Sequence, residues 1–539
     1  MFVNNFLLEF LRNNEKNSAA VYNVYKDIGG VFIKIATSTM IRDIDIFAEQ
    51  VLSIPTVDLM EKSGEAVANA VREFSDRGAR VIILCGSGNN GGDGYAAAVK
   101  LMDFYEVRVF DVFQKGQKSE SGKYWMAEYI KCGGSVRSGL PSKSEIEDET
   151  DAVVDAIFGT GFLGETPKML AELSAFLNTL KHIKRIAVDI PLGVSADDGA
   201  VKEFALRCDA TVALSFPKIA MFSYPAKEFV GRVFLDSLGL DEEIIAEKFS
   251  FDDHYVDFSF ARKLLPVRDG NTNKGSFGKA LLAVGSLEYM GAAALSLEAA
   301  LRGGAGYVTF FGCDALCDFL LNKFPEALYK RGNIADYEAL LHACEKQSSV
   351  LIGSGAGCNM ELYEAVKMLI GTEGAPLVID ADAINAISKY GNREILKNSK
   401  RPVILTPHPL EFSRLCGCSV EYIQANRYRV AKDFARDYRC IMLLKGAATI
   451  VTDGVTTYVN GSGSSALAKA GSGDVLAGLL ASILAYSRSP LESAALAAYI
   501  HGRAGDDMAR ELSNYGVTPS DIPKKVAKIM AELEKGIVR

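Results

Sequence analysis

Short apolar runs alternate with helical patterns along almost the whole chain, and this alternation restricts the possible folds more than any other feature. Strand-like runs in the first half lie at residues 81–85, 107–113, 152–156, 185–190 and 210–214. Those in the second half lie at 281–284, 307–311, 350–352, 377–380, 403–406 and 441–444, and residues 449–459 form a predicted hairpin with Asp453-Gly454 at its turn. Strands that alternate with helices are typical of parallel α/β architecture.

The length of 539 residues exceeds what one hydrophobic core normally supports, so more than one domain is expected. A polar, acidic stretch at residues 241–253 fits a boundary between two domains. We predict two doubly wound α/β domains, at residues 40–245 and 253–539. Residues 1–39 carry no motif, and we treat them as an extension of unclear role.

The composition excludes several classes of protein. A net charge of −8 leaves no basic excess to neutralise the phosphates of a nucleic acid. No apolar run is long enough to cross a bilayer, and the first ten residues lack the basic segment of a signal peptide. The ten cysteines show no CxxC pairs, which favours reduced thiols and a cytoplasmic protein. We expect neither nucleic acid nor membrane as a partner, and we expect a homo-oligomer.

A glycine-rich loop follows the first strand: Gly86-Ser87-Gly88-Asn89-Asn90-Gly91-Gly92-Asp93-Gly94. It satisfies G-x-G-x-x-G, and Asp111 ends the next strand, so a dinucleotide-dependent dehydrogenase is one interpretation. That pattern alone is weak, because glycine turns are common in α/β proteins. Asn89, Asn90 and Asp93 add oxygen atoms that suit a cation or a hydroxylated ring beside a phosphate.

Two later strands end in acids. Asp155 stands in Val-Asp-Ala-Ile-Phe-Gly-Thr-Gly, and Asp189 stands in Val-Asp-Ile-Pro-Leu-Gly. Either could be a buried structural aspartate when taken alone. Ligands of open α/β sheets bind outside the carboxyl ends of the strands, so the three loops together favour a site.

In this order, these motifs resemble the epimerase domain of the NAD(P)H-hydrate repair proteins, with a Rossmann-like three-layer fold. The resemblance implies epimerisation of the R and S hydrates, with Asn90 and Asp155 binding K⁺. A carboxylate such as Asp189 is the group that we expect to move the proton in this reaction. The family usually has Ser where this chain has Leu192. The implied contacts to the hydrated cofactor are Asn89, Asn90, Gly91, Gly92, Asp93, Gly159, Thr160, Gly161, Phe162, Leu163, Gly164, Glu165 and Asp189.

Near the end of the chain, Gly471-Ser472-Gly473-Asp474 enters an apolar helical run at residues 475–486. Free N–H groups and the helix dipole make such a turn an anion site. Asp474 there either caps its own helix or accepts a proton from a hydroxyl that attacks a phosphate.

Other strand ends of this half also carry polar groups. Thr406-Pro407-His408-Pro409 fixes a histidine between two prolines, and Lys445 follows the last parallel strand. The histidine either packs in the core or contacts a ligand. Lys445 and the glycine N–H groups suit the phosphates of a nucleotide, although no P-loop sequence occurs.

Together, Lys-Gly-Ser-Phe-Gly, Asp-Ala-Asp-Ala, Thr-Pro-His-Pro and Lys-Ala-Gly-Ser-Gly-Asp are similar to the ADP- or ATP-dependent NAD(P)H-hydrate dehydratases, which have the ribokinase-like fold. Departures from that family are Asn273 for His, Ser354 for Pro and Leu410 for Gly. The resemblance implies Mg²⁺ with ADP or ATP, and a catalytic role for Asp474. The implied contacts are Ala292, Gly355, His408 and Asp474 to the S hydrate, and Lys445, Gly446, Ala447, Ala448, Thr449 and Gly473 to the nucleotide.

We therefore expect a bifunctional enzyme that epimerises NAD(P)H hydrates and dehydrates the S form after phosphorylation of its C6 hydroxyl. One alternative is a ribokinase-type small-molecule kinase with a regulatory nucleotide-binding domain. A second is a nucleotide sensor without catalysis. The sequence leaves open whether ADP or ATP is the donor and whether NADH or NADPH hydrate is preferred.

Overall fold

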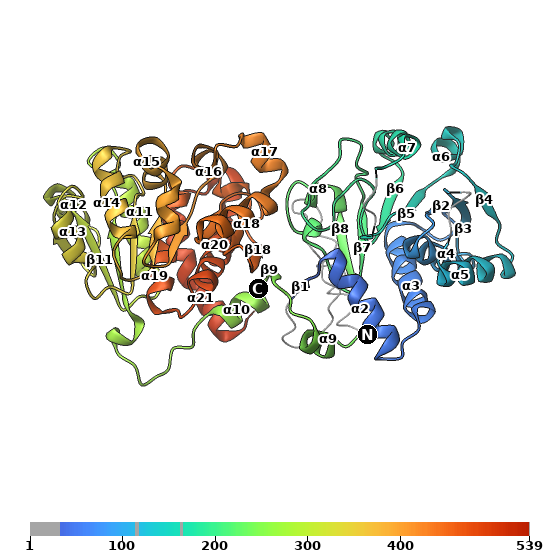
Figure 1. Ribbon diagram of the computed structural model, residues 1–539, viewed down its shortest axis with the longest axis horizontal. Helices are drawn as coiled ribbons and strands as arrows, with labels where there is room; N and C mark the ends of the chain where they lie inside the picture. The colour runs from blue at the N-terminus through green and yellow to red at the C-terminus, as the bar shows by residue number, and fades with distance from the viewer. Residues whose placement is uncertain (1–32, 114–117, 162–164, 538–539) are drawn as a thin grey trace. The chain divides into compact units, whose positions relative to one another are not determined.

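The computed structural model describes residues 33–113, 118–161 and 165–537, and the chain forms two compact units. The described part of the first unit is Ala36–Met221 and Pro225–Ser250. The second unit contains Phe251 onward, together with residues 33–35 and the short segment Phe222–Tyr224. In Figure 1 the colour follows the chain from the first unit into the second.

The first unit contains a parallel sheet in the order β4-β3-β2-β5-β6-β7-β8. The chain runs outward from β2 in one direction and from β5 in the other, so β2 and β5 flank the switch point where ligands of such sheets bind. The strands are β2 (Arg80–Cys85), β3 (Glu106–Asp111), β4 (Val136–Ser138), β5 (Ala152–Ala156), β6 (Lys184–Val188), β7 (Ala210–Leu214) and β8 (Arg232–Asp236).

Four helices of the first unit, α2, α5, α6 and α9, begin at polar N-caps. Thr37 caps α2, and Ser142 forms a capping box on α6, which satisfies backbone N–H groups that a helix leaves free. Helices α2 and α3 lie on either side of residues 53–55. The helices are α2 (Ser38–Gln50), α3 (Thr56–Phe74), α4 (Asn89–Leu101), α5 (Glu120–Lys131), α6 (Lys143–Glu149), α7 (Lys168–Thr179), α8 (Lys227–Val230) and α9 (Glu242–Lys248).

The second unit contains a sheet in the order β1-β9-β18-β17-β16-β15-β14-β13-β10-β11-β12. Strands β16 to β12 of that order are parallel, and the predicted hairpin is β17–β18. The strands are β1 (Lys34–Ile35), β9 (Asp253–Val256), β10 (Lys279–Ala283), β11 (Tyr307–Gly312), β12 (Leu328–Arg331), β13 (Ser349–Ile352), β14 (Leu377–Ile379), β15 (Val403–Leu405), β16 (Ile441–Leu444), β17 (Ile450–Thr452) and β18 (Thr457–Asn460).

Helix α19 is the buried helix that the apolar run at 475–486 predicts, and it packs on α11. At Gly478 a Cβ atom would lie 2.0 Å from the carbonyl oxygen of Ser296, so glycine permits this close approach. The helices of this unit are α10 (Phe258–Leu264), α11 (Met290–Arg302), α12 (Asp314–Leu321), α13 (Tyr337–Cys344), α14 (Met360–Ile370), α15 (Asp382–Tyr390), α16 (Pro409–Cys416), α17 (Val420–Ala425), α18 (Arg427–Tyr438), α19 (Ser472–Tyr486), α20 (Pro490–Gly516) and α21 (Ile522–Lys535).

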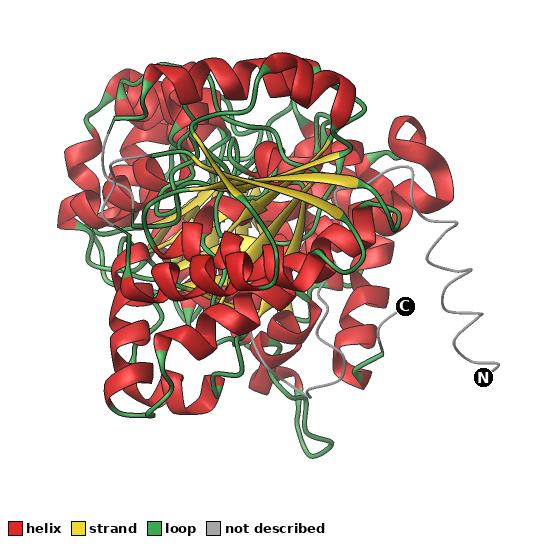
Figure 2. Cartoon of the chain, turned by 90° about the vertical axis from the view of Figure 1, so that its right-hand side faces the viewer, coloured by secondary structure: helices red, strands yellow, loops and turns green. Residues whose placement is uncertain are grey.

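The α/β fold class is confirmed, and Figure 2 shows the strands enclosed by helices. Strands β4 and β12 were not predicted, because they are short edge strands with exposed residues and no apolar run. The end of the predicted extension, at residues 33–39, contributes β1 and the start of α2. Within the described residues, no helix is both long and apolar enough to cross a membrane.

Two candidate active sites

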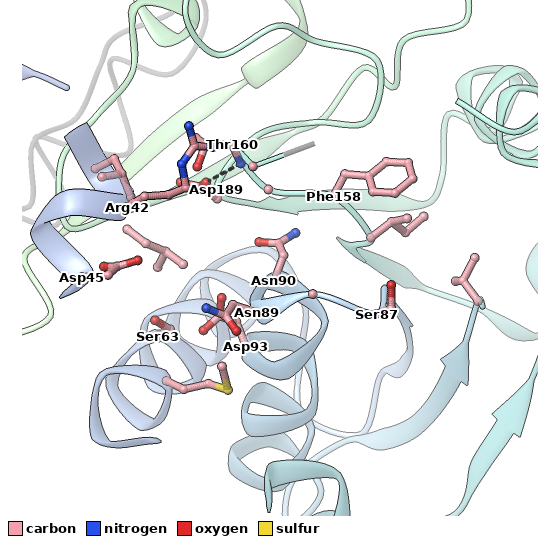
Figure 3. A pocket seen from close by; sticks show the side chains of 18 of the residues that line it. Arg42, Asp45, Ser63, Ser87, Asn89, Asn90, Asp93, Phe158, Thr160 and Asp189 are labelled. Atoms are coloured by element: carbon pink, nitrogen blue, oxygen red, sulfur yellow. Dashed lines mark hydrogen bonds between the residues drawn. The ribbon is translucent and has the colours of Figure 1, made fainter. Parts of the chain in front are cut away.

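A cavity of about 1040 Å³ opens at the carboxyl edge of the first sheet, beside the switch point between β2 and β5. Helices α2 and α3 and the start of α4 form one part of its wall, and the segments that follow the strands of the sheet form most of the rest (Figure 3). The predicted contacts among its lining residues are Asn89, Asn90, Asp93, Gly159, Thr160, Gly161, Glu165 and Asp189.

The glycines of the first loop allow the chain to turn sharply into α4. A Cβ atom at Gly91 would lie 2.0 Å from the carbonyl oxygen of Gly86, and one at Gly92 would lie 2.4 Å from the sulfur of Met60. These two glycines pack inside the unit and do not line the cavity. They place Asn90 and Asp93, both buried, in the first turn of α4.

Asp189 is held firmly at the end of β6. Its φ of 68° lies in the left-handed region, which is strained for a residue with a Cβ atom. One carboxylate oxygen accepts a hydrogen bond from Lys218 Nζ, and the other accepts from the Thr160 N–H at 3.1 Å. Lys218 is fully buried and also donates to the Leu214 carbonyl at 3.1 Å. The pairing of Asp189 with Lys218 therefore fixes the Asp189 carboxylate at the floor of the cavity.

Two further aspartates lie close to this pair. Burial raises the pKa of Asp45 to about 6, against the charge of Lys218. Burial raises the pKa of Asp93 well above its usual value, and the charge of Asp189 adds to the rise. The pKa of Asp45, at about 6, places the exchange of its proton close to neutral pH.

Asp155 lies beneath the cavity. Its two carboxylate oxygens accept hydrogen bonds from the N–H groups of Ile157 at 3.2 Å and Leu192 at 2.8 Å. Burial raises the pKa of this carboxyl group to about 6 despite these bonds. The Leu192 side chain packs in the hydrophobic core, so it offers no oxygen atom to a cation.

In the second unit, neighbouring strands β13 to β16 bring their polar ends together around Asp380. This buried carboxylate accepts hydrogen bonds from Ser354 Oγ and Thr406 Oγ1, both at 2.7 Å, and from Lys445 Nζ at 3.1 Å. Ser354, where the related dehydratases usually have proline, is thus part of this hydrogen-bond network.

Lys445 connects Asp380 to the start of α19. Burial opposes the charged form of Lys445, but Asp380 and Glu411 outweigh it and raise its pKa. A Cβ atom at Gly473 would lie 3.3 Å from Lys445 Nζ, so the glycine leaves that ammonium uncovered. Burial, and then the charge of Asp380, raises the pKa of Asp474 to about 7. The Lys445 ammonium and the Asp474 carboxylate therefore both lie near the N-terminus of α19, where free backbone N–H groups can bind an anion.

His408 is the N-cap of α16. Its Nδ1 accepts hydrogen bonds from the N–H groups of Leu410 at 3.1 Å and Glu411 at 3.3 Å, while the Glu411 carboxylate accepts from the His408 N–H at 2.8 Å. Burial, followed by the charge of Lys445, lowers the pKa of His408. The ring is therefore neutral at physiological pH, and its partly exposed side leaves room for a ligand.

Ala292 and Gly355 lie against each other although they are far apart in the sequence. Gly355 has a φ of 61°, and a Cβ atom there would lie 2.6 Å from the Ala292 Cβ. Tyr289, which is 55% exposed, borders the same place. Small residues at this point let a ligand approach the backbone of two elements.

We expect Gly355→Ala to lower kcat/KM for dehydration by about 10²-fold, because the added methyl group displaces Ala292. Gly357→Ala is a matched control: its φ of 84° gives the same backbone strain, but nothing lies within 4 Å of its Cβ position. The measurement is steady-state kinetics on the S hydrate. Equal effects of the two substitutions would contradict this packing argument.

Residues 445–449 are supported from below by Arg427, a buried side chain that the sequence did not point to. Its guanidinium donates hydrogen bonds to the carbonyls of Leu444 and Lys445, both at 3.2 Å. Burial lowers the pKa of Arg427 to about 10. The loop itself turns through Gly446, with φ 144°, and Ala448, with φ 50°.

Comparison with known proteins matches both units. The family model of the YjeF-related protein N-terminus matches residues 56–220, and that of NAD(P)H-hydrate dehydratase matches residues 280–528. A bifunctional NAD(P)H-hydrate repair enzyme of Moorella thermoacetica is 31% identical over 523 residues, which cover 93% of this chain and 98% of that protein. The chain belongs to this family.

A second repair enzyme and a solved dehydratase structure are also similar to this chain. The bifunctional NAD(P)H-hydrate repair enzyme of Helicobacter pylori is 32% identical over 484 residues, covering 87% of this chain and 95% of that protein. The crystal structure of an ADP/ATP-dependent NAD(P)H-hydrate dehydratase from Bacillus subtilis, co-crystallised with ATP and Mg²⁺, is 28% identical with a TM-score of 0.47. It covers 52% of this chain and 98% of that chain. The family models and the two bifunctional repair enzymes confirm, at the level of the family, the resemblance found in the sequence.

Some residues do not lie where the sequence analysis placed them, and others that line the cavity were missed. Asp111 pairs with Lys118 at 2.7 Å and does not line the cavity, so it is not placed as a ribose-binding acid. Phe162, Leu163 and Gly164 lie outside the described residues. Lys218 and Asp45 were missed. Lys218 follows the end of β7 and could have been found by the strand-end rule, whereas no local signal marks Asp45 in α2.

Proposed function

We propose that this chain repairs hydrated NADH and NADPH by two reactions, one in each unit. The first unit interconverts the R and S hydrates, and the second dehydrates the S hydrate at the expense of ADP or ATP. The observation that carries the proposal is a Lys445–Asp380–Asp474 arrangement at the entrance of α19 in a chain whose other unit has a separate acid-lined cavity.

In the first unit, Asn89, Asn90, Asp93, Gly159, Thr160 and Glu165 would hold the hydrated cofactor, with Asp189 as the proton-transfer group. K⁺ fits beside Asn90 and Asp155, since it takes oxygen ligands and would offset the buried charge of Asp155. Asn90 lies against Gly159, whose Cβ position is 3.3 Å from the amide oxygen. Because Leu192 gives no side-chain oxygen, the remaining ligands would be backbone carbonyls or water.

In the second unit, Lys445, Gly473 and the loop at 446–449 would bind the phosphates, while Ala292, Gly355 and His408 contact the S hydrate. Asp474 accepts the proton of the C6 hydroxyl as that oxygen attacks the terminal phosphate. Mg²⁺ carried by the nucleotide fits a place with carboxylate oxygens and would stabilise charge on the transferring group. The phosphate ester leaves far more readily than hydroxide.

The test supplies the purified protein with both NADH hydrates, Mg²⁺ and either ADP or ATP, and follows the absorbance of the regenerated dihydronicotinamide. We expect recovery of NADH from both epimers. Recovery that stops when the S epimer is exhausted would contradict the function of the first unit. A stable phosphorylated hydrate, with no NADH formed, would contradict that of the second unit.

The dehydratase should depend on pH through Asp474. Because the pKa of this carboxyl group is raised to about 7, its basic form is lost below neutrality. We expect kcat/KM for the S hydrate, at saturating Mg²⁺-nucleotide, to fall about tenfold per unit below about pH 7. An inflection near the ordinary pKa of an aspartate would contradict this assignment.

We also propose a homo-oligomer in the cytoplasm. All ten cysteines are free, which supports a reducing compartment. Size-exclusion chromatography with light scattering tests the oligomeric state.

A further inference from the structure

The cavity of the first unit contains an acid that the family contacts do not include. Asp45 lies on α2 and lines the cavity together with Arg42. Among the described residues, nothing donates a hydrogen bond to its carboxylate. A partly buried carboxylate without a hydrogen-bond donor is costly unless a ligand or water serves as its partner.

Asp189 is the second acid of this cavity, and unlike Asp45 it accepts hydrogen bonds from other residues. Lys218 and the Thr160 N–H hold both of its oxygens. Asp45 belongs to α2, whereas Asp189 follows the end of β6, so the two acids reach the cavity from different elements (Figure 3).

The two acids are electrostatically linked through Lys218. The charge of Lys218 favours the ionised form of Asp45, and the charge of Asp189 opposes it. Burial, and then the charge of Asp189, raises the pKa of the third acid of the cavity, Asp93, while a hydrogen bond with Ser63 opposes the rise. One ammonium thus acts on both acids, because Lys218 donates a hydrogen bond to Asp189 and its charge acts on Asp45.

Epimerisation at C6 needs chemistry on both faces of the ring, because the hydroxyl must leave one face and appear on the other. A single carboxylate fixed by Lys218 and Thr160 reaches only one face. We propose that Asp45 is a second catalytic residue, and that Asp45 and Asp189 act as an acid–base pair on opposite faces of the hydrated ring. This inference rests on the proposed epimerase function of the first unit.

For the epimer whose hydroxyl faces Asp45, the protonated carboxyl group gives its proton to that oxygen. The C6–O bond breaks, its electron pair leaves with water, and the ring nitrogen lone pair forms a double bond to C6. Water then adds from the other face, the double-bond electrons return to nitrogen, and the Asp189 carboxylate takes the proton that this water loses. The reverse reaction exchanges the two roles, and proton exchange with solvent restores the starting state.

The experiment uses the full-length protein without nucleotide, in water enriched in oxygen-18. Chromatography follows the interconversion of the R and S NADH hydrates, and mass spectrometry follows solvent oxygen entering each epimer. The variants are Asp45→Asn and Asp189→Asn. Asp43→Asn is the matched control, because Asp43 is an exposed acid on the same helix and does not line the cavity.

We expect the wild type and Asp43→Asn to epimerise with uptake of solvent oxygen. Asp45→Asn should lose epimerisation by about 10²-fold but still exchange oxygen in one epimer, through Asp189 acting on one face. Asp189→Asn should exchange the other epimer only. This opposite selectivity is a signature that a purely structural role cannot produce.

Three outcomes would overturn the inference. Asp45→Asn could epimerise at the wild-type rate, or it could lose oxygen exchange in both epimers while its circular dichroism is unchanged. The wild type could also epimerise without oxygen uptake, as ring opening would predict. A wild type that does not epimerise at all would instead remove the proposed function of the first unit, and the inference with it.

Discussion

Replacement of Asp474 by asparagine should lower the rate of dehydration by about 10²–10⁴-fold, the usual contribution of a positioned general base. Asparagine keeps the shape of the side chain but cannot accept a proton from the C6 hydroxyl. The native carboxylate is suited to this role, because its pKa is raised to about 7 by burial and by Asp380. Nucleotide binding should persist, since Lys445 and Gly473 are unchanged.

The measurement is single-turnover formation of NADH from the S hydrate, together with nucleotide binding by calorimetry. Asp437→Asn is the control, because Asp437 is an exposed acid of the same unit on α18. Epimerisation by the Asp474→Asn protein should equal that of the wild type. If a folded Asp474→Asn protein loses both activities, the two reactions do not have separate sites.

Much of the fold could be predicted because its central strands are buried on both faces and appear as apolar runs. Strands β5, β7 and β16 were predicted with their observed bounds, and the other central strands within a few residues. The edge strands β4 and β12 have exposed residues, so their sequences resemble those of loops. Strand β9 begins at Asp253, the last residue of the acidic stretch, and it was not predicted, because its pairing partners β1 and β18 are distant in the sequence.

The candidate sites were predictable where function is concentrated in a loop after a strand. The glycine loop at 86–94, Asp189 and the turn before Asp474 are of this kind, and their residues lie where the strands end. Asp45 and Arg427 are different, because each reaches its site from a helix. Only the tertiary fold determines what they approach, so no spacing in the sequence could reveal them.

Two departures from the family have physical explanations that the sequence could not supply. Ser354 donates a hydrogen bond to Asp380, so its hydroxyl is used where the related proteins usually have proline. Leu192 keeps the backbone N–H that bonds Asp155 and places its side chain in the hydrophobic core.

Removal of the Lys218 ammonium group at the floor of the first cavity should lower the free energy of unfolding as well as the rate of epimerisation. Lys218→Met leaves the Asp189 carboxylate buried and without its ammonium partner, and breaking such a pair typically costs about 3–5 kcal/mol. Asp189→Asn likewise leaves the Lys218 ammonium buried and without its carboxylate partner. The double substitution removes both charges, so we expect it to regain most of the lost stability while epimerisation remains absent.

The chain provides a specific probe for this experiment. Its one tryptophan, Trp125, is buried in α5 of the first unit, and its indole N–H donates to the Val57 carbonyl at 3.1 Å. Urea unfolding followed by tryptophan fluorescence therefore reports on the first unit of the intact protein. Dehydration of the S hydrate serves as the control, since it depends on the other unit. Additive losses of stability in the double substitution would mean that Lys218 and Asp189 act independently, because only a coupled pair gives a non-additive cycle.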